Sequence, residues 1–413
     1  MHEDWFARGD LTRNWTKGPM KGQQLKRILR RGVDKLRRLR RVDSVPDRER
    51  VVTLKAPGPA RGAVLVAYVI EPFLLAPGEQ ISNRHTHHWE TWRIVQAFLA
   101  RGFDVDVVSF LNRTFRPARS YDYFFAARSN FERLAAFLPA SCRKVVHLDT
   151  AHWLTNNAAA YQRLLDLRGR RGVALSNVKM VETNWALEQA DLATILGNEF
   201  TIESYRYAGK PIHRIPISAP AVYPFPEEKE FDSVRRSFLW FGSSGFVHKG
   251  LDLVLEAFAA MPEYQLSVCG PFDDEPEFLR AYEKELFHTP NIHAYGWVDV
   301  ASDKFLSICQ GCLGLVYPTA SEGGGGSAIT CMHAGLVPIL SYEASVDVDE
   351  YGIILPESSV AGIQTAVRAL ADESVTQLKA RAHGVWSLAR ERHTMDAFGA
   401  AFDRFLDDVL LPH

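Results

Sequence analysis

Hydrophobic runs long enough to cross a bilayer are missing from this sequence of 413 residues. A membrane-spanning helix needs roughly 20 consecutive apolar residues, so we do not expect an integral membrane protein. The first ten residues, MHEDWFARGD, contain acidic side chains and lack the apolar stretch of a secretory signal. We therefore expect no secretory signal.

Cysteine is scarce as well. Five cysteines in a chain of this length do not predict a disulfide framework. Cys309 and Cys312 form a CxxC pair, but no second CxxC is present to complete a zinc site. We interpret these two residues as small, buried apolar groups at a helix-to-strand turn. This cysteine usage fits a reduced, cytoplasmic compartment.

Net charge is nearly absent, at −1, but its distribution is uneven. Residues 1–50 contain 15 Lys/Arg and 7 Asp/Glu, whereas the rest of the chain contains 33 and 42. The acidic remainder shows no basic groove interleaved with aromatic residues, so we expect no nucleic-acid partner.

The basic charge concentrates in residues 21–42, KGQQLKRILRRGVDKLRRLRRV, which contain ten Lys/Arg and one acid, Asp34. The apolar residues follow a helical stripe: Leu25, Ile28, Leu29, Val33, Leu36, Leu39. One interpretation is an amphipathic helix on an anionic membrane surface. The other is a solvated helix that packs on its own protein.

Alternation of strands and helices follows from residue 51 onward, which predicts an α/β fold with parallel sheets. In the first half, the apolar run AVLVAYVI predicts a buried strand, and WETWRIVQAFLARG predicts a helix that ends at Gly102. Further strands are expected at residues 104–110, 121–127, 144–150, 191–197 and 213–218.

A stretch rich in proline and charge, residues 223–232, resembles a linker, and the alternation restarts after it. Strands are expected at residues 237–242, 265–270, 291–296, 313–318 and 336–340. A phenylalanine-rich stripe at residues 396–410 predicts a final helix. We therefore divide the chain into a basic segment (1–50), two doubly wound Rossmann-like domains (51–225 and 226–390) and a C-terminal helix (391–413) that returns to the first domain.

Ligands of open α/β sheets bind beyond the carboxyl ends of the strands, so the glycine-bearing turns there are the candidate sites. The turn FGSSGFVHKG, residues 241–250, offers small residues, hydroxyls and Lys249 before a helix. Such a turn suits a diphosphate, although it is equally consistent with a structural β–α turn.

The second turn, in YPTASEGGGGSAITCMHAGLVP, places one carboxylate, Glu322, before four glycines and a helix. Four glycines destabilise the fold entropically, so we expect a ligand to approach their bare backbone. A carboxylate beside them suits a ligand rich in hydroxyl groups.

These turns, in this order and spacing, resemble the retaining GT-B glycosyltransferases, family 4 in particular. The resemblance is good over about residues 237–370 and only topological over 51–225. It implies two Rossmann-like domains that face each other across a cleft, a nucleotide-diphospho-sugar donor and no catalytic metal. In that family a glutamate contacts the donor sugar, and a second one, eight positions later, binds the ribose.

Glu322 falls on the first of these positions and Thr330 on the second, where a hydroxyl replaces the carboxylate. Ser243 stands where the family often has an arginine, while Lys249 remains. The resemblance thus implies a donor-binding set of Gly242, Ser243, Ser244, Lys249, Trp297, Gly323, Gly324, Gly325, Gly326, Ser327 and Thr330.

The first half is expected to hold the acceptor, near SNRHTHHWE and HLDTAHW. Asp149 and His152 are the candidate catalytic residues there, beside Glu322. The histidines could instead be structural, or be metal ligands together with Asp149: His85, His87, His88, His147, His152. The family's glycine pair in the first loop is absent, with only Gly78 nearby.

We therefore expect a hexosyltransferase that acts on a glycan or lipid-linked acceptor, in bacterial surface polysaccharide synthesis. It would be cytoplasmic, with peripheral attachment to the inner face of the membrane through residues 21–42. Two alternatives remain open: another GT-B enzyme, such as a nucleotide-sugar epimerase, and a non-catalytic, membrane-associated GT-B binding protein.

Overall fold

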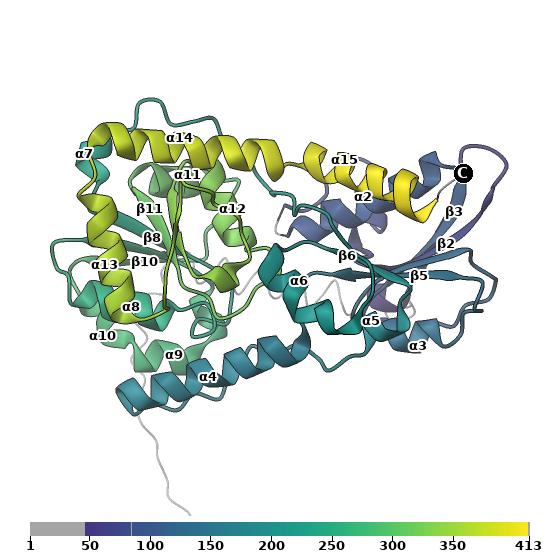
Figure 1. Cartoon of the computed structure of the whole chain (residues 1–413), viewed down its shortest axis with the longest axis horizontal. Coiled ribbons are helices and arrows are strands. Elements are labelled where there is room, and N and C mark those ends of the chain that lie inside the picture. The colour runs from purple at the N-terminus through teal and green to yellow at the C-terminus, as the bar shows by residue number, and fades with distance from the viewer. Residues whose placement is uncertain (1–45, 84, 412–413) are drawn as a thin grey trace, which may run out of the picture. The chain divides into compact units, whose positions relative to one another are not determined.

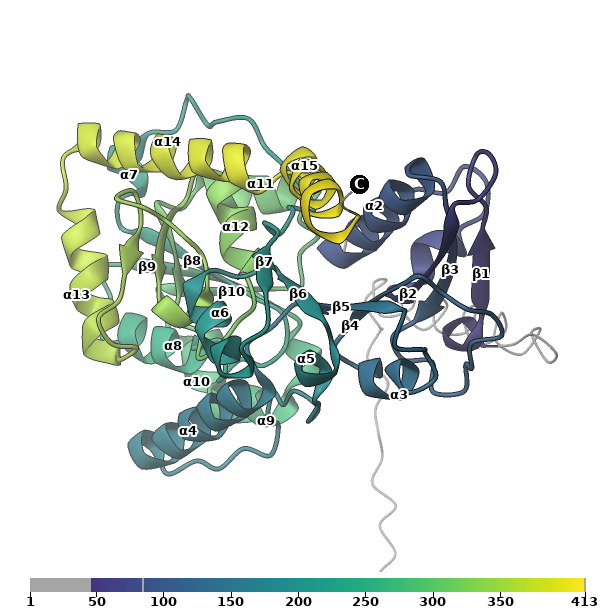
Figure 2. The same ribbon diagram turned by 45° about the vertical axis from the view of Figure 1, so that its right-hand side comes forward.

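The computed structural model describes residues 46–83 and 85–411 (Figures 1 and 2). The basic segment 21–42, with its expected membrane contact, lies outside the described residues. Both sheets of the fold belong to one compact unit that begins at Asp47. Within the described ranges, no helix is long and apolar enough to cross a bilayer.

The first sheet has seven strands in the order β1-β3-β2-β4-β5-β6-β7. Its neighbouring strands run parallel except β1 and β3, which pair antiparallel with Val51 opposite Val108. The strand β1 lies at the edge of the sheet and was not predicted from the sequence; it needs no crossover helix because it pairs antiparallel. The elements of this half are β1 (Val51–Leu54), β2 (Gly62–Tyr68), α2 (Thr86–Ala100), β3 (Phe103–Ser109), β4 (Tyr123–Ala127), α3 (Phe131–Ala135), β5 (Arg143–Leu148), α4 (Trp153–Arg171), α5 (Ala186–Gln189), β6 (Leu192–Ile195), α6 (Glu199–Tyr205) and β7 (Ile212–Arg214).

Side-chain alternation along β2 supplies both faces of this sheet. Val64 and Val66 belong to the core that includes Phe98 of α2, whereas Leu65 belongs to the core that includes Phe131 of α3. Successive side chains of a strand point to opposite faces, so an unbroken apolar run fits a strand covered on both sides. This explains why the run predicted a buried strand.

The second sheet has six parallel strands in the order β10-β9-β8-β11-β12-β13. The elements of this half are α7 (Phe231–Val234), β8 (Ser237–Phe241), α8 (Leu251–Ala259), β9 (Gln265–Cys269), α9 (Pro276–Ala281), α10 (Glu283–His288), β10 (Ile292–Gly296), α11 (Asp303–Gln310), β11 (Gly314–Tyr317), α12 (Gly326–His333), β12 (Val337–Leu340), β13 (Ile353–Ile354), α13 (Val360–Ala371), α14 (Val375–Arg392) and α15 (Met395–Phe405).

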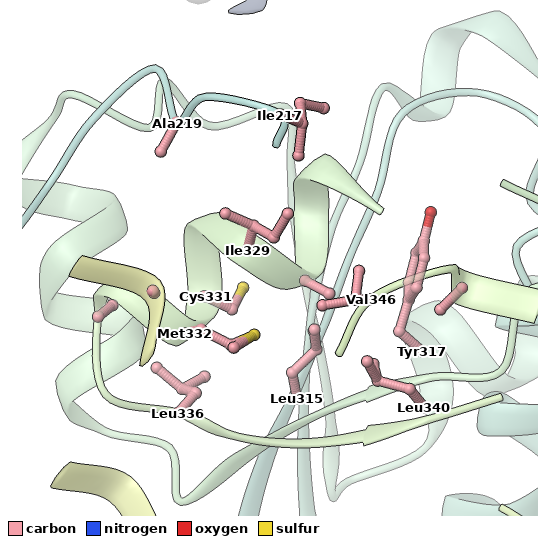
Figure 3. Close-up of a cluster of buried hydrophobic side chains, with 14 of the residues drawn as sticks. Ile217, Ala219, Leu315, Tyr317, Ile329, Cys331, Met332, Leu336, Leu340 and Val346 are labelled. Atoms are coloured by element: carbon pink, nitrogen blue, oxygen red, sulfur yellow. The ribbon is translucent and has the colours of Figure 1, made fainter. Parts of the chain in front are cut away.

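Helices cover both faces of the second sheet, with α8, α10 and α13 on one side and α11, α12 and α14 on the other (Figure 1). Ile329 and Met332 of α12 pack over Leu315 of β11 and Leu340 of β12 (Figure 3). Cys309 and Cys312 are buried and form no disulfide, which confirms their interpretation as small apolar groups.

The segment expected to be a linker packs against the second half. Tyr223 and Phe225 are buried, and the Trp386 indole of α14 donates a hydrogen bond of 2.9 Å to the Tyr223 carbonyl. The segment joins the two halves without regular structure until α7 begins at Phe231, and its aromatic residues supply apolar surface that is buried.

The C-terminal helix α15 lies on α2 of the first half (Figures 1 and 2). The Phe402 ring contacts the ring of Phe98, and the Arg93 guanidinium of α2 pairs with the Asp403 carboxylate. Helix α15, although it follows the second sheet in the sequence, therefore packs on the half that contains the first sheet.

Candidate functional site

A cavity of about 640 Å³ lies at the carboxyl ends of strands from both sheets. The first sheet contributes Arg128 after β4 and Asp149 after β5, and the second contributes Gly242 after β8 and Glu322 after β11. Carboxyl ends of parallel strands are where ligands bind in open α/β sheets. The cavity therefore occupies the position that the sequence predicted for a ligand site.

Lys249 and Glu322, which the sequence assigned to two different turns, form one ion pair. The Lys249 Nζ lies 2.5 Å from the Glu322 Oε1 and also donates a hydrogen bond of 2.7 Å to the Tyr317 hydroxyl. The Lys249 side chain is 6% exposed and that of Glu322 21% exposed. The lysine charge is therefore largely neutralised by a carboxylate of the protein itself.

The Glu322 carboxylate is ionised in spite of its enclosure. Burial alone would raise its pKa, but the Lys249 charge and the hydrogen bonds from Lys249 and Tyr317 lower the pKa to about 2. The hydrogen bonds from Lys249, Tyr317 and Thr319 all reach Oε1, and no side chain in the described ranges donates to Oε2. Oε2 is thus the oxygen that a ligand hydroxyl can approach.

The reason for glycine differs among the four positions after Glu322. A Cβ on Gly323 would collide with the backbone of Asp149 and Thr150, so the first glycine is required by close approach of the loop after β5. Gly324 and Gly325 have φ values of 131° and 44°, which side chains disfavour. Gly326 alone of the four combines an unrestricted φ with room for a Cβ, since its nearest neighbour lies at 3.8 Å. Gly323 also lines the cavity, so its close approach to the loop after β5 adds a second reason for glycine beside the expected ligand contact.

Helix α12 begins at this run and aims its first turn at the cavity. Ser327 and Thr330 line the cavity, but the Thr330 side chain is buried and its hydroxyl donates 2.8 Å to the Gly326 carbonyl. The Thr330 hydroxyl is therefore used in a hydrogen bond within its own helix. Thr330, the residue that the resemblance assigned to ribose, borders the cavity, but its hydroxyl points toward the helix backbone.

The first glycine turn also reaches the cavity through Gly242, Ser243 and Ser244. The backbone N–H groups of Gly245 and Phe246 point elsewhere, because both donate to the Glu275 carboxylate. Those two donors, which would suit a phosphate, already have an anionic partner in the protein.

Trp297 follows β10 and lies at the cavity with 58% of its surface exposed. It is the aromatic side chain with the greatest exposure among the described lining residues. A flat, exposed ring at the rim suits stacking with a planar ligand group.

Asp149 lies at the cavity on the first half, in an ion pair with the Arg128 guanidinium. The His87 Nε2 lies 3.6 Å from the other Asp149 oxygen, and its Nδ1 lies 3.0 Å from the buried Glu90 carboxylate. Burial, followed by the Arg128 charge, lowers the His87 pKa to about 3. This ring is therefore neutral at physiological pH, and burial raises the pKa of the Glu90 carboxyl that it contacts.

His152 lies away from the cavity, contrary to the expected catalytic role. Its Nδ1 accepts from the Leu154 N–H at the start of α4, and its Nε2 lies 3.2 Å from the Tyr207 hydroxyl. His152 thus caps helix α4 and is not among the residues that line the cavity. This placement does not support a catalytic role for it.

The other histidines do not assemble a metal site in the described part of the chain, where no group of three His, Cys, Asp or Glu side chains could hold a metal ion. His85 accepts from the His87 N–H at the start of α2, and the His147 Nδ1 lies 2.8 Å from the Thr194 hydroxyl. These contacts favour the structural interpretation of the cluster.

Sequence reasoning missed Arg128, Lys179, His248 and Tyr317, all of which line the cavity. Arg128 and Tyr317 stand at the carboxyl ends of strands, so the strand-end rule would have found them. His248 precedes Lys249 in the first turn. Lys179 lies in an extended stretch after α4 without periodicity or motif, and no signal in the sequence marks it.

A scan against protein-family models and a search of curated protein sequences return no match. Known structures do resemble the fold. A sucrose-phosphate synthase from Thermosynechococcus elongatus matches with a TM-score of 0.60 and 15% identity, over 85% of this chain and 99% of that one. Anabaena HepE, in complex with UDP and glucose, matches with a TM-score of 0.54 and 10% identity, over 84% and 100% of the two chains.

A trehalose-6-phosphate synthase structure matches similarly, with a TM-score of 0.57 and 10% identity over 85% of this chain and 99% of that one. At these identities the comparison concerns the fold. The chain has the GT-B fold, with two Rossmann-like sheets, which confirms the fold expected from the sequence.

Proposed function

We propose that the protein is a retaining glycosyltransferase that moves a sugar from a nucleotide-diphospho-sugar to an acceptor. The observation that carries this proposal is the buried Lys249–Glu322 pair, placed beside a glycine turn and a helix start on a large cavity. The fold adds support, because HepE was determined with UDP and glucose, and the trehalose-6-phosphate synthase was studied for glycosyl transfer with retention.

In this proposal the second half binds the donor. The Glu322 Oε2 accepts hydrogen bonds from sugar hydroxyls, while Lys249 and Tyr317 hold Oε1 in place. The N–H groups at the start of α12 face the diphosphate, where the helix dipole favours negative charge. Trp297 provides a ring for the nucleobase at the rim of the cavity.

The transfer proceeds on one face of the sugar. An acceptor hydroxyl attacks the anomeric carbon as the bond from that carbon to the diphosphate oxygen breaks, and the departing phosphate takes the hydroxyl proton. Charge develops on the leaving group, so cations and N–H groups around it lower the barrier. No metal or other cofactor is required by this scheme.

Asp149 is a second carboxylate that lines the cavity, besides Glu322. Its ion pair with Arg128 and its contact with His87 hold it on the first half. A nucleophile for double displacement would have to leave that ion pair. We therefore assign Asp149 to holding the acceptor rather than to forming a covalent intermediate.

A panel of nucleotide sugars, with and without glycan acceptors, tests the proposal through release of nucleoside diphosphate. UDP-glucose is the first donor to try, and the anomeric configuration of the product should be retained by NMR. Glu322→Gln should reduce turnover by about tenfold or more, because a charge-assisted contact is lost. Glu283→Gln, on the exposed surface of α10, is the matched control.

Each other outcome of the panel has a distinct meaning. Interconversion of the donor sugar without any acceptor would identify an epimerase. Binding of nucleotide sugars without turnover would identify a non-catalytic binding protein. Failure of every nucleotide and nucleotide sugar to bind would refute the proposal.

We further propose that the acceptor is a lipid-linked glycan at an anionic membrane surface, of the kind used in bacterial surface polysaccharide synthesis. The support is the sequence of residues 21–42, whose ten basic residues would each contribute about 1 kcal/mol near such a surface. Deleting residues 1–45 should release the protein from anionic vesicles and leave activity on a soluble acceptor unchanged. Full-length protein that fails to sediment with such vesicles at low salt would refute this part.

A further inference from the structure

Three cationic side chains line the cavity among the described residues: Arg128, Lys179 and Lys249. Two of them are paired, since Arg128 contacts Asp149 and Lys249 contacts Glu322. Lys179 forms no ion pair with any residue in the described ranges. A dianionic ligand in this cavity therefore meets one cation that has no carboxylate at ion-pair distance among the described residues.

Lys179 is held directly against the first glycine turn of the second half. Its Nζ donates 3.3 Å to the Ser244 carbonyl, next to Ser243. Its side chain crosses Gly245, where an added Cβ would lie 2.6 Å from the Lys179 Cδ. Glycine at position 245, with φ of 94°, is thus what lets the lysine reach the turn.

The backbone of Lys179 is anchored by the first half. Asn156 of α4 donates 3.1 Å to the Lys179 carbonyl, and its neighbour Asn157 exchanges two hydrogen bonds with Val181, of 2.9 and 2.8 Å. Both asparagine side chains are buried. The segment after α4 is therefore pinned at two positions, and Lys179 reaches the second half from a defined place.

Neighbouring charges act on Lys179 in both directions. Partial burial of its side chain, followed by the charge of Lys249, lowers the Lys179 pKa, whereas the Glu322 and Glu275 carboxylates raise it. Glu322 is already paired with Lys249, and Lys179 is exposed to solvent, so Lys179 is the cation that an incoming anion can reach. The Gly245 and Phe246 N–H groups cannot compensate, because Glu275 already accepts from both.

We propose that Lys179 binds the diphosphate of the donor and that the first half of the chain thereby completes the donor site. This inference rests on the proposed function. It adds to the donor site a residue, Lys179, that belongs to no sequence motif. Its chemical target is the diphosphate rather than the base or the sugar. Binding of the nucleotide then requires the segment after α4 to be seated on the turn at Ser244.

Calorimetry with UDP, UMP and uridine tests the inference, with GDP and ADP as replacement probes if UDP does not bind. Lys179→Met should weaken UDP binding by about tenfold or more, weaken UMP binding less and leave uridine binding unchanged. Lys179→Arg should keep most of the UDP affinity. Lys284→Met, on the exposed surface of α10, is the matched control and should bind UDP like the parent chain.

A second readout separates direct contact from a structural effect. Salt weakens charge–charge contacts, so UDP binding to Lys179→Met should depend less on salt than binding to the parent chain. Thermal unfolding should be unchanged in this variant. If the parent binds UDP and Lys179→Met binds it like Lys284→Met, the inference is overturned while the proposed function stands. If the parent binds no nucleoside diphosphate, the proposed function fails and this inference falls with it.

Discussion

Replacing Glu322 with glutamine should destabilise the fold by an amount that the ion pair with Lys249 determines. A pKa lowered from 4.5 to about 2 corresponds to about 3 kcal/mol, at roughly 1.4 kcal/mol per pKa unit. Removing one partner of a buried pair costs about 3–5 kcal/mol, which agrees in magnitude. Glu322→Gln keeps the shape of the side chain and strands the Lys249 charge, so we expect a loss of about 3 kcal/mol at pH 7.

The pH dependence has a definite sign. The pKa of Glu322 is lower in the folded state than in the unfolded state, so its contribution is present above about pH 4.5 and disappears as the pH falls toward 2. The stability difference between the parent chain and Glu322→Gln should therefore be constant above pH 6. It should narrow as the pH drops below 4.5.

Urea unfolding followed by tryptophan fluorescence measures this difference at each pH. Lys249→Met and the double variant complete a mutant cycle. The double variant should lose less stability than the two single variants together, because it leaves neither charge stranded. A Glu322→Gln protein as stable as the parent at pH 7, with no coupling in the cycle, would refute the ion pair and the argument built on it.

Three other substitutions test the positions of individual residues. Gly323→Ala should destabilise the protein by about 1–3 kcal/mol or more, because its Cβ meets the backbone of Asp149. Gly326→Ala, where a Cβ has room, should leave the thermal midpoint unchanged; equal thermal midpoints for the two variants would contradict the close approach at Gly323. Thr330→Val should keep the affinity for nucleoside diphosphate, since the hydroxyl donates to its own helix; weaker binding in calorimetry would mean that the hydroxyl turns to the ligand. His152→Ala should cost about 1 kcal/mol of stability as a lost cap and leave turnover per folded molecule intact; a turnover loss at unchanged stability would return it to the catalytic residues.

The order and limits of most strands could be predicted from local pattern alone. Residues 237–242, 265–270 and 336–340 were expected as strands and contain β8, β9 and β12. Such runs are readable because a strand covered on both faces must be apolar at every position. The strand β1 escaped prediction, because its burial alternates only between exposed and partly buried positions at the sheet edge.

The two glycine turns also predicted correctly that the cavity lies at the carboxyl ends of the strands of the second sheet. Lys249, Glu322 and the start of α12 line the cavity that those turns predicted. A strand that ends at a turn of small residues before a helix involves only neighbouring residues, so it can be recognised in the sequence. What each side chain contacts there was not predictable, since Lys249 and Glu322 are 73 positions apart and meet as an ion pair.

The sequence by itself determined the alternation of strands and helices, the apolar faces they bury and the two turns at which a ligand can approach, because each depends on neighbouring residues. The tertiary structure alone decided that Gly323 is needed to pass the Asp149 backbone and that Lys179 crosses to the turn at Ser244. These contacts join segments that no periodicity relates. They exist only because the folded chain brings the loops after β5 and α4 onto the strand ends of the second sheet.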